Sequence, residues 1–171
     1  GVWEKAEPIS PTTSDGRPIV LFDYDTELGN RLRDHSKEKV VIVKASDCFR
    51  VLGKRENRVY EINPDTASDY AKLLEMLTLE YGTPRMVLYL WGTRPETNGP
   101  FDLDGSLDKA IYPFFHLTKV FMQKKLIEPV QLIFLHERIH ERSNPLFAAV
   151  DNFAKTIAME SQKLRIKSLE I

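Results

Sequence analysis

The stretch "NPLFAAVDNFAKTIAMESQKLRIKSLEI", residues 144–171, decides the fold because a helical pattern in it leads into a strand pattern. Apolar residues recur at helical spacing over residues 144–162, with Asn144 as the predicted N-cap and Pro145 at the first helical position. Residues 164–171 read as a strand, and so does the apolar run "VQLIFLHE" at 130–137. This succession predicts a right-handed βαβ unit with parallel strands.

The same alternation continues toward the N-terminus. Strands are predicted at 18–23, 39–45, 58–63 and 85–92, and helices at 26–37, 66–82 and 106–126. Thr66 and Ser106 are predicted N-caps, and Pro113 should kink the third helix or shift its start. Residues 44–57 and 93–105 are predicted loops. We therefore expect an α/β three-layer sandwich with a mostly parallel sheet of about six strands.

Composition favours one soluble domain over residues 1–171. The 171 residues, 42% of them hydrophobic, suffice for one full core. Lys and Arg number 24 and Asp and Glu 25, so no net field would attract nucleic acid or a membrane, and we expect neither as a partner. No apolar run reaches the roughly 18 residues of a membrane span, and residues 1–17, read as an N-terminal strand and linker, show no secretion signal. The single cysteine, Cys48, excludes an internal disulfide and reads as a small buried hydrophobe, so we expect a cytoplasmic setting.

The first strand-to-helix turn, "VLFDYDTELGN" at residues 20–30, carries three acids and one glycine. A dinucleotide site there needs several glycines, so that backbone N–H groups can approach the pyrophosphate, and the acids would repel it. The turn resembles the haloacid dehalogenase pattern, which implies an alternative function as a magnesium-dependent phosphatase, with Asp23 as nucleophile and Asp25 as acid/base. The family's later acidic strand ends are missing. The structural alternative is that Asp25 or Thr26 caps the following helix.

The sequence "HERIH", residues 136–140, matches the zinc motif HExxH letter for letter. It continues a predicted strand, where His136 and His140 would lie about 13 Å apart, too far to share a metal. Glu160, conceivable as a third ligand, belongs to a separate helix. We therefore expect no metal site. His35 and His116 are single histidines on predicted helices and read as solvated or hydrogen-bonded in the core.

The stretch 144–171 also resembles the fifth helix and following strand of short-chain dehydrogenase/reductases, whose pattern includes "F-T-K-S-L-A-x-E". Aligning residues 153–160 with that pattern puts Ser143 at the position of the catalytic tyrosine and Phe147 at that of the lysine. The tyrosine protonates the developing alkoxide, and the lysine lowers its pKa and holds the nicotinamide ribose. The resemblance therefore implies no catalytic and no cofactor-binding residues in this chain.

Nearly the whole chain resembles the N-terminal, non-catalytic subdomain of modular polyketide synthase ketoreductases. Among these, it is most similar to subdomains of bacterial trans-acyltransferase synthases. Six stretches carry the resemblance, namely "VWEKAEP" (2–8), "PIVLFDYDTELGNRL" (18–32), "RVYEINPDTASDYAKLLEML" (58–77), "MVLYLWG" (86–92), "FFHLTKVFMQKKLIEPVQLIFL" (114–135) and "AAVDNFAKTIAMESQKLRIKSLEI" (148–171). It implies a truncated Rossmann-like core over 18–171. It further implies a catalytic subdomain in cis that binds NADPH, neighbouring synthase domains as further partners, and a place in polyketide antibiotic biosynthesis.

The resemblance also implies a contact surface. In homodimeric relatives two helices of each subunit pack into a four-helix interface, which this subdomain would imitate within one chain. The candidate partner-facing residues are apolar positions of the last two predicted helices, namely Ile111, Phe114, Phe115, Val120, Phe121, Leu146, Val150, Phe153 and Ile157. The alternative is that the same residues build the chain's own core.

Overall fold

The structure, a computed structural model, describes residues 15–92, 110–136 and 145–170, and of residues 145–148 it describes the backbone only. Within these ranges seven strands form one sheet in the order β3-β4-β2-β1-β5-β6-β7. The strands are β1 (Ile19–Phe22), β2 (Val40–Ala45), β3 (Arg50–Leu52), β4 (Val59–Ile62), β5 (Met86–Tyr89), β6 (Val130–His136) and β7 (Leu164–Glu170). All neighbouring pairs are parallel except β3 with β4.

Without β3, the strand order is that of a doubly wound Rossmann-type sheet. In such a sheet the chain starts at a central strand, adds strands toward one edge, then returns to the centre and adds strands toward the other edge. The point of reversal lies between the neighbouring strands β1 and β5. This is the crevice in which such folds hold their ligands. The expected α/β class with a mostly parallel sheet is therefore confirmed.

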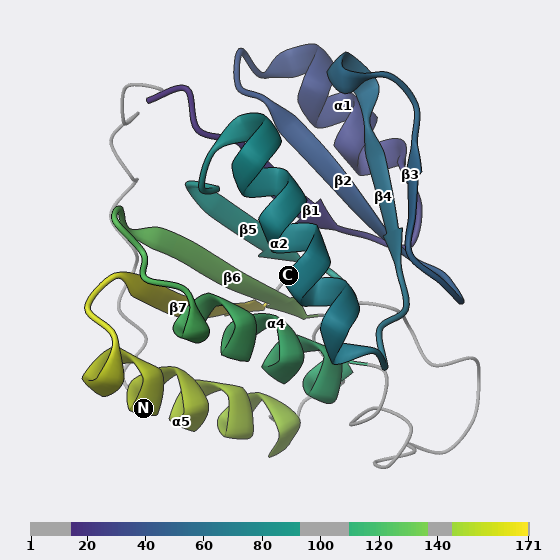
Figure 1. The fold of residues 1–171 in the computed structure, drawn as a ribbon. Helices are drawn as coiled ribbons and strands as arrows, with labels where there is room; N and C mark the ends of the chain where they lie inside the picture. Colours follow the sequence, from purple (N-terminus) through teal and green to yellow (C-terminus); the bar gives the residue numbers. More distant parts are fainter. Residues whose placement is uncertain (1–14, 93–109, 137–144, 171) are drawn as a thin grey trace, which may run out of the picture.

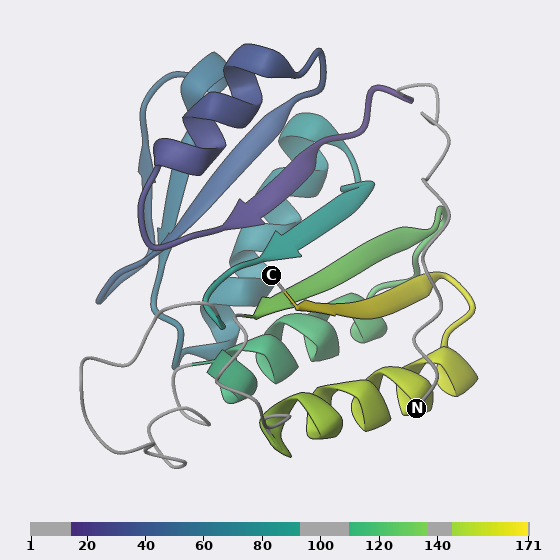
Figure 2. The same ribbon diagram turned by 180° about the vertical axis from the view of Figure 1, so that it is seen from behind.

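Helices cover the two faces of the sheet unequally (Figures 1 and 2). On one face lie α2 (Ala67–Tyr81), α4 (Tyr112–Gln123) and α5 (Pro145–Glu160), and on the other lies α1 (Glu27–His35). No helix among the described residues is long and apolar enough to span a membrane.

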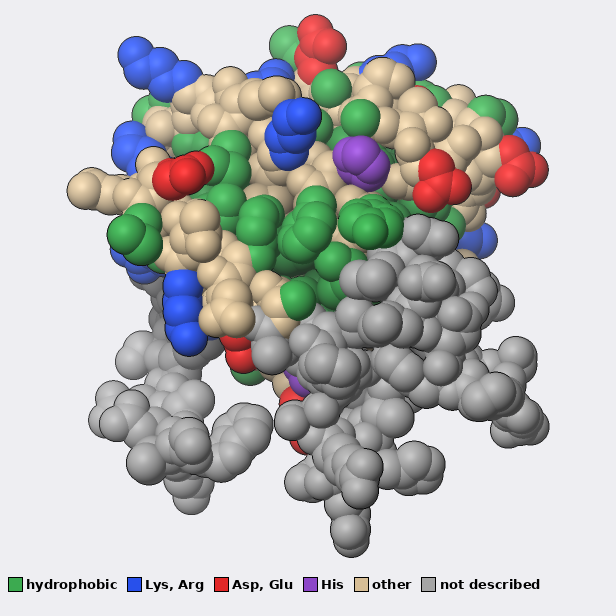
Figure 3. Space-filling view, turned by 90° about the horizontal axis from the view of Figure 1, so that it is seen from below, with side chains coloured by type: hydrophobic (Ala, Val, Ile, Leu, Met, Phe, Trp, Pro, Cys, Tyr) green, Lys and Arg blue, Asp and Glu red, His purple; other side chains and the backbone are tan. Residues whose placement is uncertain are grey.

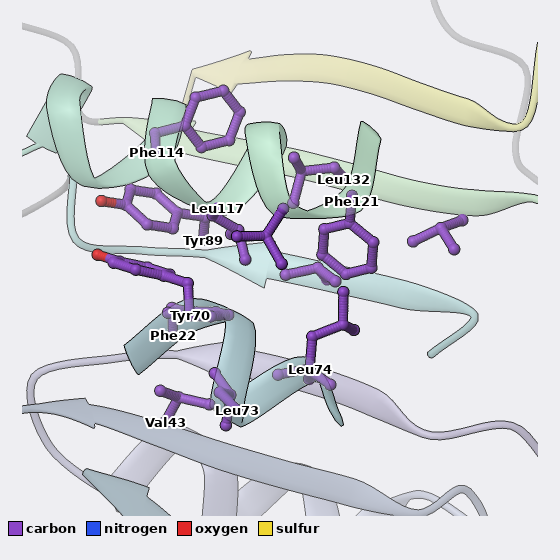
Figure 4. Close-up of a cluster of buried hydrophobic side chains, with 14 of the residues drawn as sticks. Phe22, Val43, Tyr70, Leu73, Leu74, Tyr89, Phe114, Leu117, Phe121 and Leu132 are labelled. Atoms are coloured by element: carbon purple, nitrogen blue, oxygen red, sulfur yellow. The ribbon is translucent and has the colours of Figure 1, made fainter. Parts of the chain in front are cut away.

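The main core fills the space between the sheet and the three-helix face (Figure 4). Aromatic rings from neighbouring strands meet there, with Tyr89 and Phe134 stacked at 5.6 Å between centroids and Phe114 of α4 edge-on to Phe134 at 4.9 Å. Tyr70 of α2 brings a ring from a second helix, 6.5 Å from that of Phe22. Burial of such large apolar surface is the main source of stability in a domain of this size.

One segment of the fold differs from the sequence-based predictions. The predicted solvated loop at 44–57 contains the strand β3 and a short 3₁₀ helix (Arg55–Asn57), so the sheet has one strand more than expected. Pro113 is the second residue of α4 and follows the π-helical residues Ala110 and Ile111, so the backbone changes from π to α geometry beside the proline. The start of the predicted helix at 106–109 lies outside the described residues. The predicted loop 93–105 and the predicted caps Ser106 and Asn144 lie outside the described residues.

Candidate functional site

The turn between β1 and α1 uses its own carboxylates to bind its backbone N–H groups. Asp23 Oδ1 accepts the N–H of Tyr24 at 2.7 Å, and Asp25 Oδ1 accepts the N–H of Glu27 at 2.8 Å. Thr26 stands at the N-cap without a side-chain hydrogen bond, so Asp25 supplies the cap from the preceding position. These are the donors that a phosphate would need at the start of this helix.

The single glycine of the turn serves helix packing. Gly29 is buried in α1, and a Cβ atom there would lie 2.4 Å from Ile42 Cδ1 and 3.3 Å from Leu21 Cδ2. Since real Cβ contacts are longer, only glycine lets α1 approach β1 and β2 this closely. In dinucleotide-binding folds the third glycine of the fingerprint has the same role. The chain thus keeps the glycine that packs the helix, while the two phosphate-facing glycine positions of that fingerprint hold Tyr24 and Thr26, with acidic residues at 23, 25 and 27 around them.

Aromatic side chains from the segments that follow β1 and β5 contact each other at the point of chain reversal. The Tyr24 hydroxyl donates a hydrogen bond to the Trp91 carbonyl oxygen at 3.1 Å, and the two rings are 6.2 Å apart. The Leu90 N–H donates to the Phe22 carbonyl at 2.9 Å, which extends the pairing beyond the strand ends. Tyr24 was not among the residues that the sequence singled out, although an aromatic residue directly after the first strand was a visible signal.

The phosphatase alternative gains no support from this edge of the sheet. Burial, aided by the neighbouring charge of Asp25, raises the pKa of Asp23 above its ordinary value. Such a shift fits a buried structural acid as well as a functional one. The described parts of β5 and β6 end in Tyr89 and His136 and supply no acidic pair, and the described residues hold no cluster of three or more metal-ligating side chains.

The remaining candidate residues do not assemble into a site. His136 ends β6, with Nε2 3.1 Å from Ser168 Oγ of β7, while His140 lies outside the described residues. Ser143 also lies outside them, and of Phe147 only the backbone is described. Cys48 is exposed, which corrects the prediction of a buried residue. It sits in the solvated segment just before β3.

The two other single histidines also have structural contacts. His35 Nδ1 lies 2.8 Å from the Arg31 carbonyl oxygen on its own helix, and the His116 ring packs 6.0 Å from that of Tyr70.

The structure divides the candidate partner-facing residues into core and surface. Six of them are at most 7% exposed and belong to the chain's own core, namely Ile111, Phe114, Val120, Phe121, Val150 and Ile157. Buried side chains cannot contact a partner, so for these residues the core alternative holds. The side chain of Leu146 is outside the described part. Phe115 and Phe153 are partly exposed, and their ring centroids are 4.4 Å apart between α4 and α5.

Around this aromatic pair lies an apolar surface that we call the α4–α5 face, formed by Tyr112, Phe115, Met122 and Phe153. Tyr112 is 49% exposed and Met122 is partly exposed, and the sequence analysis had not included either. Figure 3 looks onto this side of the molecule and shows hydrophobic side chains gathered in a band. At one end of the band an open hollow is lined by Asp65, Tyr112, Phe115 and His116. The band is therefore the most apolar part of the surface seen in this view.

Comparisons with known proteins agree with this geometry. A family model described as "Beta-ketoacyl synthase-like, N-terminal" matches residues 17–171. The chain is similar to the solved structure of "an N-terminal ketoreductase from macrolactin assembly line", with a TM-score of 0.76 and 21% identity over 98% of this chain and 34% of that one. No curated protein matches the chain.

Two further solved structures share the fold. One is the "Adenylation, ketoreductase, and pseudo Asub multidomain structure of a keto acid-selecting NRPS module", with a TM-score of 0.74 and 15% identity over 95% of this chain and 14% of that one. The other is a short-chain dehydrogenase/reductase from Serratia marcescens, with a TM-score of 0.61 and 11% identity over 91% of this chain and 78% of that one. The chain therefore spans 14% and 34% of the two ketoreductase-containing chains that it resembles.

Proposed function

The chain belongs to the family described as beta-ketoacyl synthase-like, N-terminal, and from this premise we propose that it is the non-catalytic structural subdomain of a polyketide synthase ketoreductase. In this role it packs against a catalytic subdomain in the same polypeptide and stabilises it. That partner uses NADPH to reduce β-ketoacyl groups on a carrier protein. Neighbouring synthase domains are further partners, in a bacterial cytoplasm.

The observation that carries this proposal is the contrast within the β1–α1 turn. Gly29 keeps the close packing of helix on sheet that a Rossmann-type fold needs. The N–H groups of Tyr24 and Glu27, which would serve a phosphate, are bound by Asp23 and Asp25. Two carboxylates at this point disfavour a pyrophosphate by charge as well. A structural role, without cofactor binding, accounts for both the retained packing at Gly29 and the N–H groups that the aspartates occupy.

The relative lengths of the similar chains support a partner in cis. The region of similarity covers 98% of this chain but only 34% of the macrolactin ketoreductase chain. Two thirds of that chain therefore lie outside the region of similarity, which leaves room for a catalytic unit there.

The α4–α5 face is the surface that we assign to the contact with the catalytic subdomain. It combines an exposed aromatic pair, Phe115 and Phe153, with a flanking hollow. Aromatic side chains that fill pockets in the centre of an interface contribute most of its binding energy. The buried candidates beneath the pair hold it in place.

The proposal is tested on a polypeptide that contains both halves. Phe153→Asp places a charge in the α4–α5 face, whereas Met159→Asp places one on the same helix at an 88% exposed position. The control lies about 120° around the helix from Phe153, at roughly 100° per residue. We expect Phe153→Asp to lower the melting temperature of the catalytic half and its NADPH-dependent reduction of a β-ketoacyl thioester, and Met159→Asp to leave both unchanged.

The isolated chain supplies the second measurement. If Phe153→Asp unfolds residues 1–171 on their own, the milder Phe153→Ser replaces it, because a loss of folding would mimic a loss of contact. Equal behaviour of the Phe153 and Met159 variants in the two-half polypeptide would contradict the proposal. NADPH-dependent turnover by residues 1–171 alone would contradict it as well.

A further inference from the structure

The parallel register of the sheet aligns side chains into rows that cross several strands. One row contains Ile42, Leu21, Leu88, Ile133 and Lys167, taken from β2, β1, β5, β6 and β7 in turn. The adjacent row contains Val40, Ile19, Met86, Gln131 and Arg165. Both rows lie on the face that carries α1, because Gly29 of α1 contacts Ile42 and Leu21. We call the part of this face over β5, β6 and β7 the back face.

The helix α1 covers only one end of these rows. Ile42 and Leu21, beneath α1, are fully buried. Beyond β1, Figure 2 shows no helix of the described part of the chain over β5, β6 and β7. The opposite side of the same three strands packs against α4 and α5. The sheet is therefore covered by helices on both sides at one end and on one side at the other.

The back face has the composition of a surface that binds a partner. Met86, Leu88 and Leu135 are partly exposed, and Leu169 is 46% exposed. Strands of a parallel sheet are ordinarily buried on both faces, which explains the apolar sequence of β5 and β6. On the edge strand β7, Arg165 and Lys167 are exposed next to this apolar area. Apart from Gln131, a partly exposed polar residue of β6, the surface is thus apolar over β5 and β6 and cationic at its rim.

We propose that an amphipathic helix from outside residues 1–171 of the same polypeptide lies on the back face and places acidic side chains opposite Arg165 and Lys167. This rests on the proposed function, since it requires a longer chain. Three strands at about 4.8 Å spacing span roughly 10 Å, which is the diameter of one helix. Opposite charges at an interface rim set orientation and exclude wrong partners.

The same charges disfavour a second copy of this chain as the occupant. In a two-fold contact whose axis runs across the strands, the rim of Arg165 and Lys167 would lie against the same rim of the other copy, where like charges repel. A helix that places acids opposite Arg165 and Lys167 avoids that repulsion. It also covers the apolar rows as α1 covers them over β1 and β2.

A zero-length carbodiimide crosslink tests the proposal in the polypeptide that contains both halves. This reagent joins a lysine amine to a carboxylate that it contacts. We expect Lys167 to be joined to an Asp or Glu outside residues 1–171, and the crosslinked peptide to be lost in Lys167→Gln. Lys155→Gln, at an exposed position of α5, should leave its yield unchanged.

A second variant tests the contact at the back face independently of the α4–α5 face. The double change Arg165→Glu with Lys167→Glu alters exposed side chains only, so the isolated chain should keep its melting temperature, while the longer polypeptide should lose several degrees. A crosslink of Lys167 only to acids within residues 1–171, or between two copies, would overturn the proposal. So would an unchanged melting temperature of the longer polypeptide. Phe153→Asp reports on the proposed function independently of either result.

Discussion

The hydroxyl of Tyr24 donates a hydrogen bond to the carbonyl oxygen of Trp91, 3.1 Å away, and so joins the segments that follow β1 and β5. These two strands are neighbours in the sheet but are separated in the chain by α1, β2, β3, β4 and α2. In doubly wound folds a ligand lies between the segments that follow such strands. In this protein a side chain of its own makes that connection.

Removing the Tyr24 hydroxyl should destabilise the fold slightly. Tyr24→Phe keeps the ring and deletes one hydrogen bond, so we expect the free energy of unfolding to fall by about 1 kcal/mol. Tyr112→Phe, at an exposed position, should change it by less than about 0.5 kcal/mol. Urea denaturation of the isolated chain measures both. Equal losses in the two variants would mean that the bond to Trp91 contributes nothing.

Gly29→Ala should be among the most damaging single-methyl changes in the chain. The new Cβ would lie 2.4 Å from Ile42 Cδ1, and Ile42 is fully buried, so any shift of its side chain must displace other core atoms. Overpacking of this kind costs about 1–3 kcal/mol, and replacing glycine gains roughly 1 kcal/mol of helix propensity, so the expected net loss is up to about 2 kcal/mol. Thermal unfolding followed by circular dichroism should show a lower melting temperature. Asn30→Ala, at the next and exposed position, serves as the control.

Glu80 should give the domain part of its resistance to acid. It forms an ion pair with Arg58 and accepts the Tyr60 hydroxyl at 2.8 Å. Burial alone would raise its pKa, but the hydrogen bonds from Tyr60 and Arg58 and the charge of Arg58 lower it below the ordinary 4.5. A lowered folded-state pKa gives stability that is fully present above 4.5 and is lost as the pH falls through the folded-state value.

Glu80→Gln should therefore cost about 1–3 kcal/mol at pH 7, since hydrogen bonds to charged groups are lost. The difference between wild type and variant should shrink as the pH drops below 4.5. Urea titrations at pH 7 and at pH 3 measure it, with Glu75→Gln at an exposed site of the same helix as the control. A difference that does not depend on pH would assign the effect to packing rather than to charge.

Asp23→Asn should not destabilise the protein at pH 7. Burial raises the pKa of Asp23, so its charged form is disfavoured in the folded state and costs stability above that pKa. Asparagine removes the charge and keeps the Oδ1 atom that accepts the Tyr24 N–H. We expect equal or greater stability at pH 7 and no difference at a pH low enough to protonate Asp23. Magnesium-dependent phosphatase turnover that disappears in this variant would instead revive the alternative function.

The sequence predicted the regular strands well because their patterns are long or strongly apolar. It missed β3, which has three exposed residues and depends on pairing with β4, including the ion pair of Arg50 with Glu61 at 2.9 Å. Such a short strand has no periodicity of its own. It exists because its partner strand supplies the hydrogen bonds.

The candidate contact surface was harder to predict than the fold. Helical periodicity finds apolar positions but does not say which neighbour each one meets. Phe114 and Phe115 are adjacent in sequence, yet the first is buried against the sheet and the second faces α5. Their separation by about 100° around the helix sends them to different neighbours. Only the position of α5 beside α4 reveals which apolar residue stays partly exposed.

The central place of β1 in the sheet has a consequence for synthesis on the ribosome. β1 is the first of the described strands to be made, and β2 can pair with one of its edges soon afterwards. Its other edge waits for β5, whose last partner residue is Tyr89, opposite Phe22. Until then the nascent chain carries a strand edge with unpaired N–H and C=O groups, the kind of edge that pairs with other chains. The growing polypeptide therefore exposes one edge of β1 until residue 89 has emerged, and a translational pause before that point would prolong this exposure.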